Sequence, residues 1–402
     1  MGVFRLNIKI EKAYLSGEID AIPSKSYAHR IAICNFLSGE EPTANCGEFS
    51  SNDIFVTENC LKNLKEGKTV LDCGESGSTL RFMLPLCAAL GGNYTFIGHG
   101  KLMDRPNEEL FAVLKANGVS AVKTDKIEIS GNLTAGEYKI RGDISSQYIS
   151  GLLMALPTLK GDSKITLTTP LVSAPYVDIT IEVLEKYGVN IIKERNGYIV
   201  KGNQVYKGFV KPEGDWSNMA FFLVAGAVNG DITVSGLNLD SVQGDKYIID
   251  ILKKAGASIE LKGDKIRVKK SNLKAFTFSA EDCPDLVPIS AVLASYAQGV
   301  TVISNIERLK IKESDRVEST IAMLKGFGIN ADTDGKCLAI FGGKVTAGVA
   351  DAFNDHRLAM STAVLALGVD GVSQINGAEA INKSYPTFFR DYNKLGGASS
   401  EV

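Results

Sequence analysis

The same short arrangement recurs six times along this chain of 402 residues: polar or charged residues stand directly before an apolar segment of helical length. The six copies begin at Ser24, Ser76, Ser145, Asp215, Pro284 and Asn354. Their successive starts are 52, 69, 70, 69 and 70 residues apart. A fixed period indicates one supersecondary element used repeatedly, and six such repeats are too many for one compact core. We therefore predict two lobes of three repeats each.

Each repeat holds two predicted helices of different character. The apolar helices run to Gly39, Gly91, Gly161, Gly230, Gly299 and Gly368, and amphipathic helices begin near Asp53, Pro106, Tyr176, Asp245, Asp315 and Pro386. A helix that is apolar on all sides must be buried, so we expect the amphipathic helix and a sheet to cover it. Four amphipathic helices end at a glycine suited to a left-handed C-cap, namely Gly118, Gly188, Gly256 and Gly328. Strands are expected after these glycines, which predicts an α/β fold.

The composition excludes several kinds of partner. A net charge of -2 and a pI near 6.1 argue against nucleic acid or an acidic membrane. The seven cysteines form no CxxC pair, which is typical of reduced thiols, and the three histidines are too dispersed for a zinc site. The chain start lacks an apolar signal segment, and no apolar run approaches the ~18 residues that span a bilayer. We expect a cytoplasmic protein.

The polar residues at the helix starts form the candidate site. Helix N-termini attract anions, and three of the six apolar helices carry Lys or Arg in their first two turns. Singly, Ser24, Ser76 and Asp285 are typical of ordinary N-caps, and the charged run 310–316 is typical of a solvated face. Jointly they predict a site for a highly charged small molecule. Neither 67–69 nor 98–100 completes an ATP- or NAD-binding motif.

These residues match a known family. The chain resembles the 5-enolpyruvylshikimate-3-phosphate (EPSP) synthases, or 3-phosphoshikimate 1-carboxyvinyltransferases, over nearly its whole length. The matching motifs are Pro23-Ser24-Lys25-Ser26 with Arg30, Gly77-Ser78-Thr79-Leu80-Arg81, Arg105-Pro106, Ser145-Ser146-Gln147, Ser173-Ala174-Pro175-Tyr176, Glu213-Gly214-Asp215, Pro284-Asp285, Lys312-Glu313-Ser314-Asp315-Arg316, Asp355-His356-Arg357 and Lys383.

The resemblance implies a fold and a reaction. The fold is two-lobed, an inside-out α/β barrel in which each lobe has three βαβαββ repeats with buried helices. We expect residues 1–20 and 214–402 in a first lobe and 21–213 in a second lobe. The reaction transfers the enolpyruvyl group of phosphoenolpyruvate to the 5-hydroxyl of shikimate 3-phosphate and releases phosphate, a step toward chorismate and aromatic amino acids. No cofactor or metal is implied, and a monomer is expected.

The resemblance also assigns roles to the matched residues. Asp285 is the implied base near the 5-hydroxyl, and Lys25 and Glu313 handle proton transfer at phosphoenolpyruvate, in an order that stays open. Shikimate 3-phosphate is assigned to Lys25, Ser26, Arg30, Ser145, Ser146, Gln147, Ser173, Tyr176, Asp285 and Lys312. Phosphoenolpyruvate is assigned to Lys25, Gly77, Arg105, Gln147, Arg316, Arg357 and Lys383. The first lobe would carry most of the phosphoenolpyruvate and acid–base residues, and the second lobe most of the shikimate 3-phosphate residues.

Two departures and two alternatives accompany this interpretation. Glu75 and Arg308 differ from residues common in the family, which leaves the response to glyphosate open. A UDP-N-acetylglucosamine enolpyruvyl transferase would share the fold but typically uses a loop cysteine, where this chain has Met103-Asp104-Arg105-Pro106. A protein that only binds phosphorylated metabolites is the other alternative, and the presence of Lys25, Asp285 and Glu313 argues against it.

The distribution of charge predicts a closing motion. Cations of both lobes would repel each other in an empty cleft, and an anion that touches both sets would favour the closed form. We expect saturating shikimate 3-phosphate to reduce the radius of gyration in solution X-ray scattering, with hinges near residues 20 and 213. Identical scattering with and without the ligand would contradict closure but leave the reaction untouched.

Overall fold

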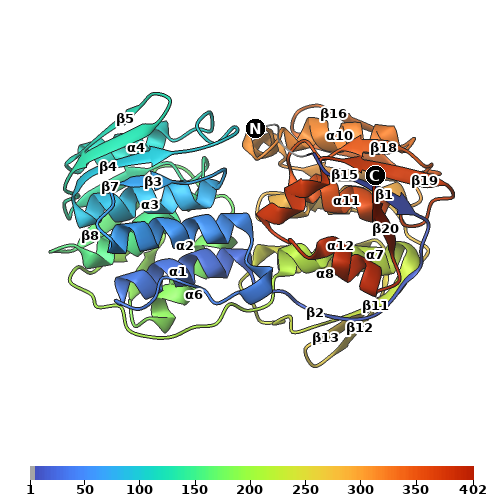
Figure 1. The fold of residues 1–402 in the computed structure, drawn as a ribbon, viewed down its shortest axis with the longest axis horizontal. Coiled ribbons are helices and arrows are strands. Elements are labelled where there is room, and N and C mark those ends of the chain that lie inside the picture. The colour runs from blue at the N-terminus through green and yellow to red at the C-terminus, as the bar shows by residue number, and fades with distance from the viewer. Residues whose placement is uncertain (1–4) are drawn as a thin grey trace. The chain divides into compact units, whose positions relative to one another are not determined.

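The computed structural model describes residues 5–402, and the chain divides into two compact lobes (Figure 1). The first lobe consists of the residues up to Ser24 together with Glu213–Val402, and the second lobe is Lys25–Pro212. The chain therefore leaves the first lobe once and returns to it once. Where the two passages meet, Pro23 forms an isolated antiparallel bridge with Gly214.

Six helices are buried almost completely, as the apolar segments predict. The second lobe contains α1 (Lys25–Leu37), α3 (Gly77–Leu90) and α5 (Ser146–Ala155), and the first lobe contains α7 (Trp216–Asn229), α9 (Val287–Ser295) and α11 (His356–Ala366). Every residue of α9 and α11 is buried. Within the first lobe, α7, α9 and α11 pack against one another. A side chain at the start of such a helix has no wide solvent face to turn to, so polar groups there must find partners.

Five four-stranded sheets share one strand order. In the second lobe the sheets are β3 (Val70–Asp72), β4 (Gly92–Ile97), β6 (Ile127–Gly131), β5 (Val119–Lys123), and β7 (Glu137–Ile140), β8 (Ser163–Leu167), β10 (Gly197–Val200), β9 (Ile191–Glu194), in spatial order. In the first lobe they are β2 (Leu15–Asp20), β11 (Gly230–Ser235), β13 (Lys265–Lys269), β12 (Ser258–Lys262); β14 (Thr277–Ser279), β15 (Val300–Ser304), β17 (Cys337–Phe341), β16 (Asn330–Thr333); and β18 (Val349–Asp351), β19 (Val372–Asn376), β1 (Asn7–Glu11), β20 (Ala398–Glu401).

The shared order explains the position of the buried helices. The first two strands of each sheet run parallel, and the other neighbours are antiparallel. Parallel strands need a crossover, and in four of the five sheets a buried helix supplies it, as α3 does between β3 and β4. The exception is β2, which pairs with β11 although the chain passes through the whole second lobe between them. The N-terminal strand β1 completes the last sheet by pairing with β19 and β20.

Six further helices cover the buried ones, as the amphipathic segments predict. They are α2 (Asn52–Lys65), α4 (Glu108–Ala116), α6 (Ala174–Lys186), α8 (Ile248–Lys254), α10 (Arg316–Gly326) and α12 (Phe388–Lys394). The four predicted glycine caps are confirmed by positive φ angles, between 75° at Gly188 and 94° at Gly118. The expectation that Pro106 opens its helix is wrong, because Asn107 stands at the N-cap and α4 begins at Glu108.

The first repeat differs from the other five. In the described chain, the segment between α1 and α2 contains a 3-10 turn, Gly47–Phe49, and no strand. The α1–α2 pair therefore has no four-stranded sheet assembled from its own repeat. This difference accompanies the short first spacing of 52 residues and shows that the helix pair is the part of the repeat present in all six copies.

Candidate active site

Arg316 is the centre of a charged cluster in the first lobe. It is the first residue of α10, and its side chain is 1% exposed. Its guanidinium donates to Oδ1 of Asp285 at 2.6 Å, and it also donates to Oε2 of Glu313 at 2.6 Å and to Oδ2 of Asp355 at 2.7 Å. Burial works against its charge, but the three carboxylates outweigh burial and raise the pKa of Arg316 above its ordinary value. Arg316 thus holds three acidic side chains together.

Asp285 lies between two arginines and does not cap the helix that follows it. It belongs to a 3-10 turn, Pro284–Leu286, ahead of α9. Its Oδ1 accepts from Arg316, and its Oδ2 accepts from Nη2 of Arg357 at 2.9 Å. Arg357 also donates to the backbone oxygen of Asp285 at 3.2 Å. The interpretation of Asp285 as an ordinary N-cap is therefore wrong, because its carboxylate is directed to charged partners.

The cations around Asp285 control its protonation. Burial alone would raise the pKa of Asp285, but Arg357, Lys312 and Arg316 hold it well below its usual range. Nζ of Lys312 lies 3.7 Å from Oδ1 of Asp285. Burial lowers the pKa of Lys312 to about 8, although Asp285 opposes this shift. In this cluster Asp285 is an ion-paired carboxylate, and Lys312 gives up its proton more readily than an exposed lysine.

Asp355 and Lys383 complete the cluster. Asp355 caps α11 by accepting from the backbone N–H of Arg357 at 2.9 Å while it also binds Arg316. Lys383 donates to the backbone oxygen of Asn354 at 2.8 Å. The structure therefore brings together every first-lobe residue predicted for the site: Asp285, Lys312, Glu313, Arg316, Arg357 and Lys383.

Asp245 is an acid of this neighbourhood that the sequence analysis treated only as a helix start. It is 4% exposed and lies in the 3-10 turn Gly244–Tyr247, before α8. Burial raises the pKa of Asp245 to about 7, and the nearby carboxylate of Asp285 adds to the rise. An aspartate at the start of an amphipathic helix is normally a solvated residue near the positive helix end. The sequence carries no signal that distinguishes a buried aspartate from that common case.

In the second lobe, Lys25 pairs with an acid that the sequence analysis did not assign to the site. Lys25 opens α1, and its Nζ lies 2.9 Å from Oδ2 of Asp53, in the first turn of α2. The two side chains are 18% and 17% exposed. The pair therefore joins the starts of α1 and α2 at a position that solvent and small ligands can reach.

Arg30 is a buried cation whose hydrogen-bond partners are neutral. It is 3% exposed, and Nε donates to Oγ1 of Thr180 at 2.6 Å. Further bonds go to the backbone oxygens of Ser26 at 2.7 Å and Tyr176 at 2.8 Å, and to Oγ of Ser150 at 3.2 Å. Burial lowers the pKa of Arg30 to about 10, so it stays charged at neutral pH. These partners leave its positive charge uncompensated, which favours an anion nearby.

Gln147 connects the starts of α3 and α5. Its Nε2 donates to Oγ of Ser78 at 2.8 Å, and its Oε1 accepts from Nη1 of Arg81 at 2.7 Å. Ser145 caps α5 by accepting from the backbone N–H of Gln147 at 3.3 Å. The cap interpretation of Ser145 is confirmed, and Ser146 follows it as the first residue of α5. Arg81 is a buried residue of the site region that the sequence analysis quoted in a motif but did not assign.

Gly77 and Arg105 are in direct contact. A methyl group placed at the Cα of Gly77 would lie 2.7 Å from Nη1 of Arg105, so the guanidinium occupies the space that any other residue would need. Gly77 is the first residue of α3. Glu75 packs in the same way against Gly100, in the segment that leads to Arg105. This arrangement requires glycine at 77 for a steric reason and keeps Arg105 at the start of α3.

Ser173 occupies a conformation that serine seldom adopts. Its φ is 54°, in the left-handed region, and it is 2% exposed at the N-cap of α6. Tyr176 follows in the first turn of α6, where its backbone oxygen accepts from Arg30. Contacts thus join the starts of α1, α5 and α6 around Arg30. A buried, strained non-glycine residue at this place indicates a functional constraint on the turn.

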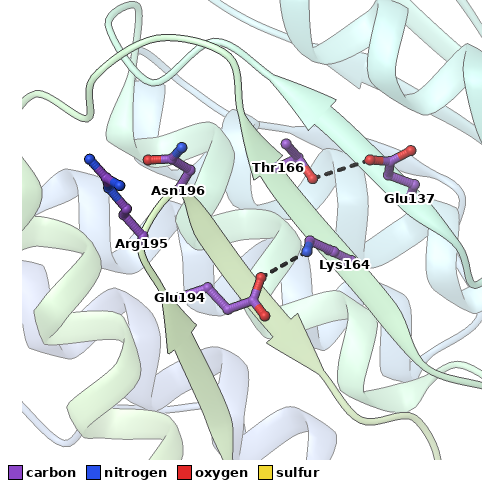
Figure 2. A pocket seen from close by; sticks show the side chains of 6 residues that line it. All are labelled: Glu137, Lys164, Thr166, Glu194, Arg195 and Asn196. Carbon is purple, nitrogen blue, oxygen red and sulfur yellow. Dashed lines mark hydrogen bonds and ion pairs between the residues drawn. The ribbon is translucent and has the colours of Figure 1, made fainter.

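A separate shallow pocket lies on the sheet of β7–β10 and is not part of the candidate site. Its lining residues are Glu137, Lys164, Thr166, Glu194, Arg195 and Asn196 (Figure 2). Lys164 forms an ion pair with Glu194 at 2.8 Å, and Thr166 donates to Glu137 at 3.3 Å. None of the predicted site residues lines this pocket. Its charges are largely neutralised by partners on neighbouring strands.

Two searches of residues 5–402 gave negative results. No group of three or more His, Cys, Asp or Glu side chains in that range is arranged to hold a metal ion. No helix in the same range has the length and apolar character needed to cross a membrane.

Curated relatives cover almost the whole chain. A protein of Clostridium novyi named 3-phosphoshikimate 1-carboxyvinyltransferase is 40% identical, and the match covers 98% of each chain. A protein of Clostridium kluyveri with the same name is also 40% identical, again over 98% of each.

Solved structures share the fold. EPSP synthase from Acinetobacter baumannii superposes with a TM-score of 0.78 at 23% identity, covering 98% of this chain and all of the other. The enolpyruvyl transferase NikO from Streptomyces tendae also gives a TM-score of 0.78, at 16% identity and over 99% of each chain. The family model described as EPSP synthase (3-phosphoshikimate 1-carboxyvinyltransferase) matches residues 10–392. The chain belongs to the EPSP synthase family.

Proposed function

We propose that this protein transfers the enolpyruvyl group of phosphoenolpyruvate to the 5-hydroxyl of shikimate 3-phosphate and releases inorganic phosphate. Family membership supports the reaction, and the observation that supports it at residue level is the carboxylate of Asp285 held between Arg316 and Arg357. A base beside two anion-binding groups is what this chemistry needs. The cytoplasmic location, the monomeric state and the distribution of substrates between the lobes remain predictions.

Shikimate 3-phosphate is assigned to the residues around Arg30. Because the hydrogen-bond partners of Arg30 are neutral, a phosphate or carboxylate group would supply the missing negative charge. The remaining assigned residues offer hydroxyl, amide and ammonium donors at helix starts: Lys25, Ser26, Ser145, Ser146, Gln147, Ser173, Tyr176 and Lys312. Asp285 would accept from the reacting hydroxyl. This donor set suits a sugar-like ring that carries a phosphate.

Phosphoenolpyruvate is assigned to three arginines and their neighbours. Arg316 and Arg357 present planar guanidinium groups that can bind a carboxylate or phosphate through two parallel bonds. Arg105 would add a third fork beside the backbone of Gly77, with Gln147, Lys25 and Lys383 completing the set.

Substrate binding would change the state of Asp285. In the ligand-free cluster Arg357 and Arg316 hold the pKa of Asp285 well below its usual range, which makes it a weak base. An anion that takes bonds from Arg357 removes part of this stabilisation and makes Asp285 more basic. We propose that phosphoenolpyruvate thereby activates the base in the complex in which it is needed.

The bond changes follow from these roles. The 5-hydroxyl oxygen forms a bond to C2 of phosphoenolpyruvate as Asp285 accepts the hydroxyl proton, and Lys25 or Glu313 delivers a proton to C3. Phosphate then leaves C2, and a proton leaves C3 to restore the double bond. Atoms and charges balance without a redox partner. The direct test is phosphate release from phosphoenolpyruvate with shikimate 3-phosphate as acceptor; release with UDP-N-acetylglucosamine instead would favour the alternative transferase.

Asp285→Asn tests the base. The substitution keeps the shape of the side chain but removes the proton acceptor, so we expect kcat to fall by ~10²-fold or more. Steady-state kinetics would measure this, with circular dichroism to check the fold. Turnover near the unmodified rate would show that Asp285 is not the base.

Arg357→Lys tests recognition of phosphoenolpyruvate. Lysine keeps the charge but cannot form two parallel bonds to one anion. We expect KM for phosphoenolpyruvate to rise at least ~10-fold, a typical consequence of losing a charge-assisted bond, with little change in binary binding of shikimate 3-phosphate. Titration calorimetry that gives the reverse pattern would move Arg357 to the other subsite.

Gly77→Ala tests the contact with Arg105. The added methyl must displace the guanidinium, which is the flexible end of a side chain, so the fold should tolerate the change. We expect KM for phosphoenolpyruvate to rise with little change in Tm, and a bulkier competitor such as glyphosate to lose more affinity than the substrate. Unchanged affinity for both ligands would remove Gly77 from the site.

A further inference from the structure

A chain of buried hydrogen bonds links α1, α2 and α3 behind the candidate site. Nδ1 of His29 lies 2.8 Å from Oγ1 of Thr57, and Oγ1 of Thr57 lies 2.6 Å from Oγ1 of Thr79. Oγ1 of Thr79 lies 2.8 Å from Oγ of Ser76, the N-cap of α3. Each of these four side chains is at most 1% exposed. We call these four residues the hydroxyl chain.

The hydroxyl chain touches the site at both ends without belonging to it. Ser76 precedes Gly77, whose Cα carries the guanidinium of Arg105. His29 stands one turn after Lys25 on α1. In the middle, Thr57 donates to the backbone oxygen of Asp53 at 3.3 Å, and the carboxylate of Asp53 pairs with Lys25. One set of buried bonds therefore spans the residues that position Lys25 and those that position Gly77.

The direction of the chain follows from the histidine. Nε2 of His29 is buried and has no hydrogen-bond partner among residues 5–402. Burying an N–H without an acceptor is rarer and more costly than burying an unused lone pair, so the proton belongs on Nδ1. Nδ1 then donates to Thr57, Thr57 to Thr79, and Thr79 to Ser76. Burial, with the charges of Lys25 and Arg30, holds the pKa of His29 well below its usual range, which keeps the ring neutral.

A fixed direction leaves each oxygen with a defined role. Oγ of Ser76 accepts both from the hydroxyl of Thr79 and from its backbone N–H, the latter at 3.2 Å. Ser76 is thereby locked as the cap of α3, and the following turn, which contains Gly77 and Ser78, is fixed in one conformation. Without the chain, Ser76 would keep only the ordinary cap bond, and the turn could adopt other arrangements.

We propose that His29, Thr57 and Thr79 are positioning residues that hold the first turn of α3 in its ligand-binding conformation, in register with Lys25. The proposal rests on the assignment of phosphoenolpyruvate to the Gly77–Arg105 turn. It predicts that loss of the chain weakens phosphoenolpyruvate more than shikimate 3-phosphate, because Arg30, Ser145 and Tyr176 lie outside it.

Thr57→Val and Thr57→Ser form the central comparison. Valine has nearly the same shape but no hydroxyl, and serine keeps the hydroxyl. We expect Thr57→Val to raise KM for phosphoenolpyruvate about 5- to 10-fold, the effect of one or two neutral hydrogen bonds. Binary binding of shikimate 3-phosphate should change less than about twofold on the same scale, and Thr57→Ser should restore KM. Thr301→Val removes another fully buried threonine hydroxyl, in β15, and should lower Tm without changing KM.

Variants of His29 extend the comparison. Asparagine places an N–H donor close to the position of Nδ1, and leucine does not. We expect His29→Asn to keep KM and His29→Leu to raise it as Thr57→Val does, with no further rise in the double variant, because both break the same chain. Additive effects, or an unchanged KM in Thr57→Val and His29→Leu alongside a lower Tm, would overturn the proposal.

Two further measurements keep the test decisive. Nitrogen-15 NMR of the unmodified protein reports the His29 tautomer even if a variant fails to fold, and the chain has three histidines, so His29→Asn identifies the signal. We expect the proton on Nδ1; a proton on Nε2 would overturn the direction on which the proposal depends. Gly77→Ala separates the two hypotheses: if it leaves KM for phosphoenolpyruvate unchanged, the substrate assignment fails, whereas an effect there with none in Thr57→Val defeats only the hydroxyl chain.

Discussion

Burial of six helices that are apolar on nearly every side is the constraint on which the rest of this structure depends. Such a helix is stable only inside a lobe, so its first turn, with unpaired backbone N–H groups, is drawn into the interior as well. The charged residues there cannot turn to a wide solvent face. They pair with one another, as Arg316 does with three carboxylates, or with neutral oxygens, as Arg30 does.

The two lobes use these helix starts differently. In the first lobe, cations and carboxylates are interleaved so closely that each arginine has an acidic partner, and Asp285 is shared by two of them. Removing one member of a buried pair such as Arg316–Asp355 costs about 3–5 kcal/mol, so this arrangement is rigid as well as charged. In the second lobe, hydroxyl and carbonyl oxygens surround Arg30 and leave its charge available. The first arrangement suits acid–base chemistry, and the second suits binding of a phosphate.

The strained and tightly packed positions lie beside the same groups. Ser173 has a left-handed backbone in the turn that leads to the Arg30 partners, and Gly77 lies under the guanidinium of Arg105. Both positions restrict where a ligand-binding side chain can move. A site that is fixed before the ligand arrives loses less conformational entropy on binding. The hydroxyl chain contributes to the same rigidity from the buried side of α1, α2 and α3.

The sequence by itself determined the number of repeats, the buried and amphipathic helices, the glycine caps and the residue types of the site, because these depend on local periodicity and on capping chemistry. It also determined the family, through motifs such as Asp355-His356-Arg357. The tertiary structure alone decided which acid each cation meets. Asp285 is bound by two arginines and does not cap a helix, Asp245 is buried, and His29 reaches Thr57 and Thr79, because these contacts join segments far apart in the chain. The missing sheet of the first repeat has the same origin: β2 follows the general strand order only by pairing with β11, across the whole second lobe. Periodicity describes what a segment buries, whereas the partner it meets depends on how distant segments pack.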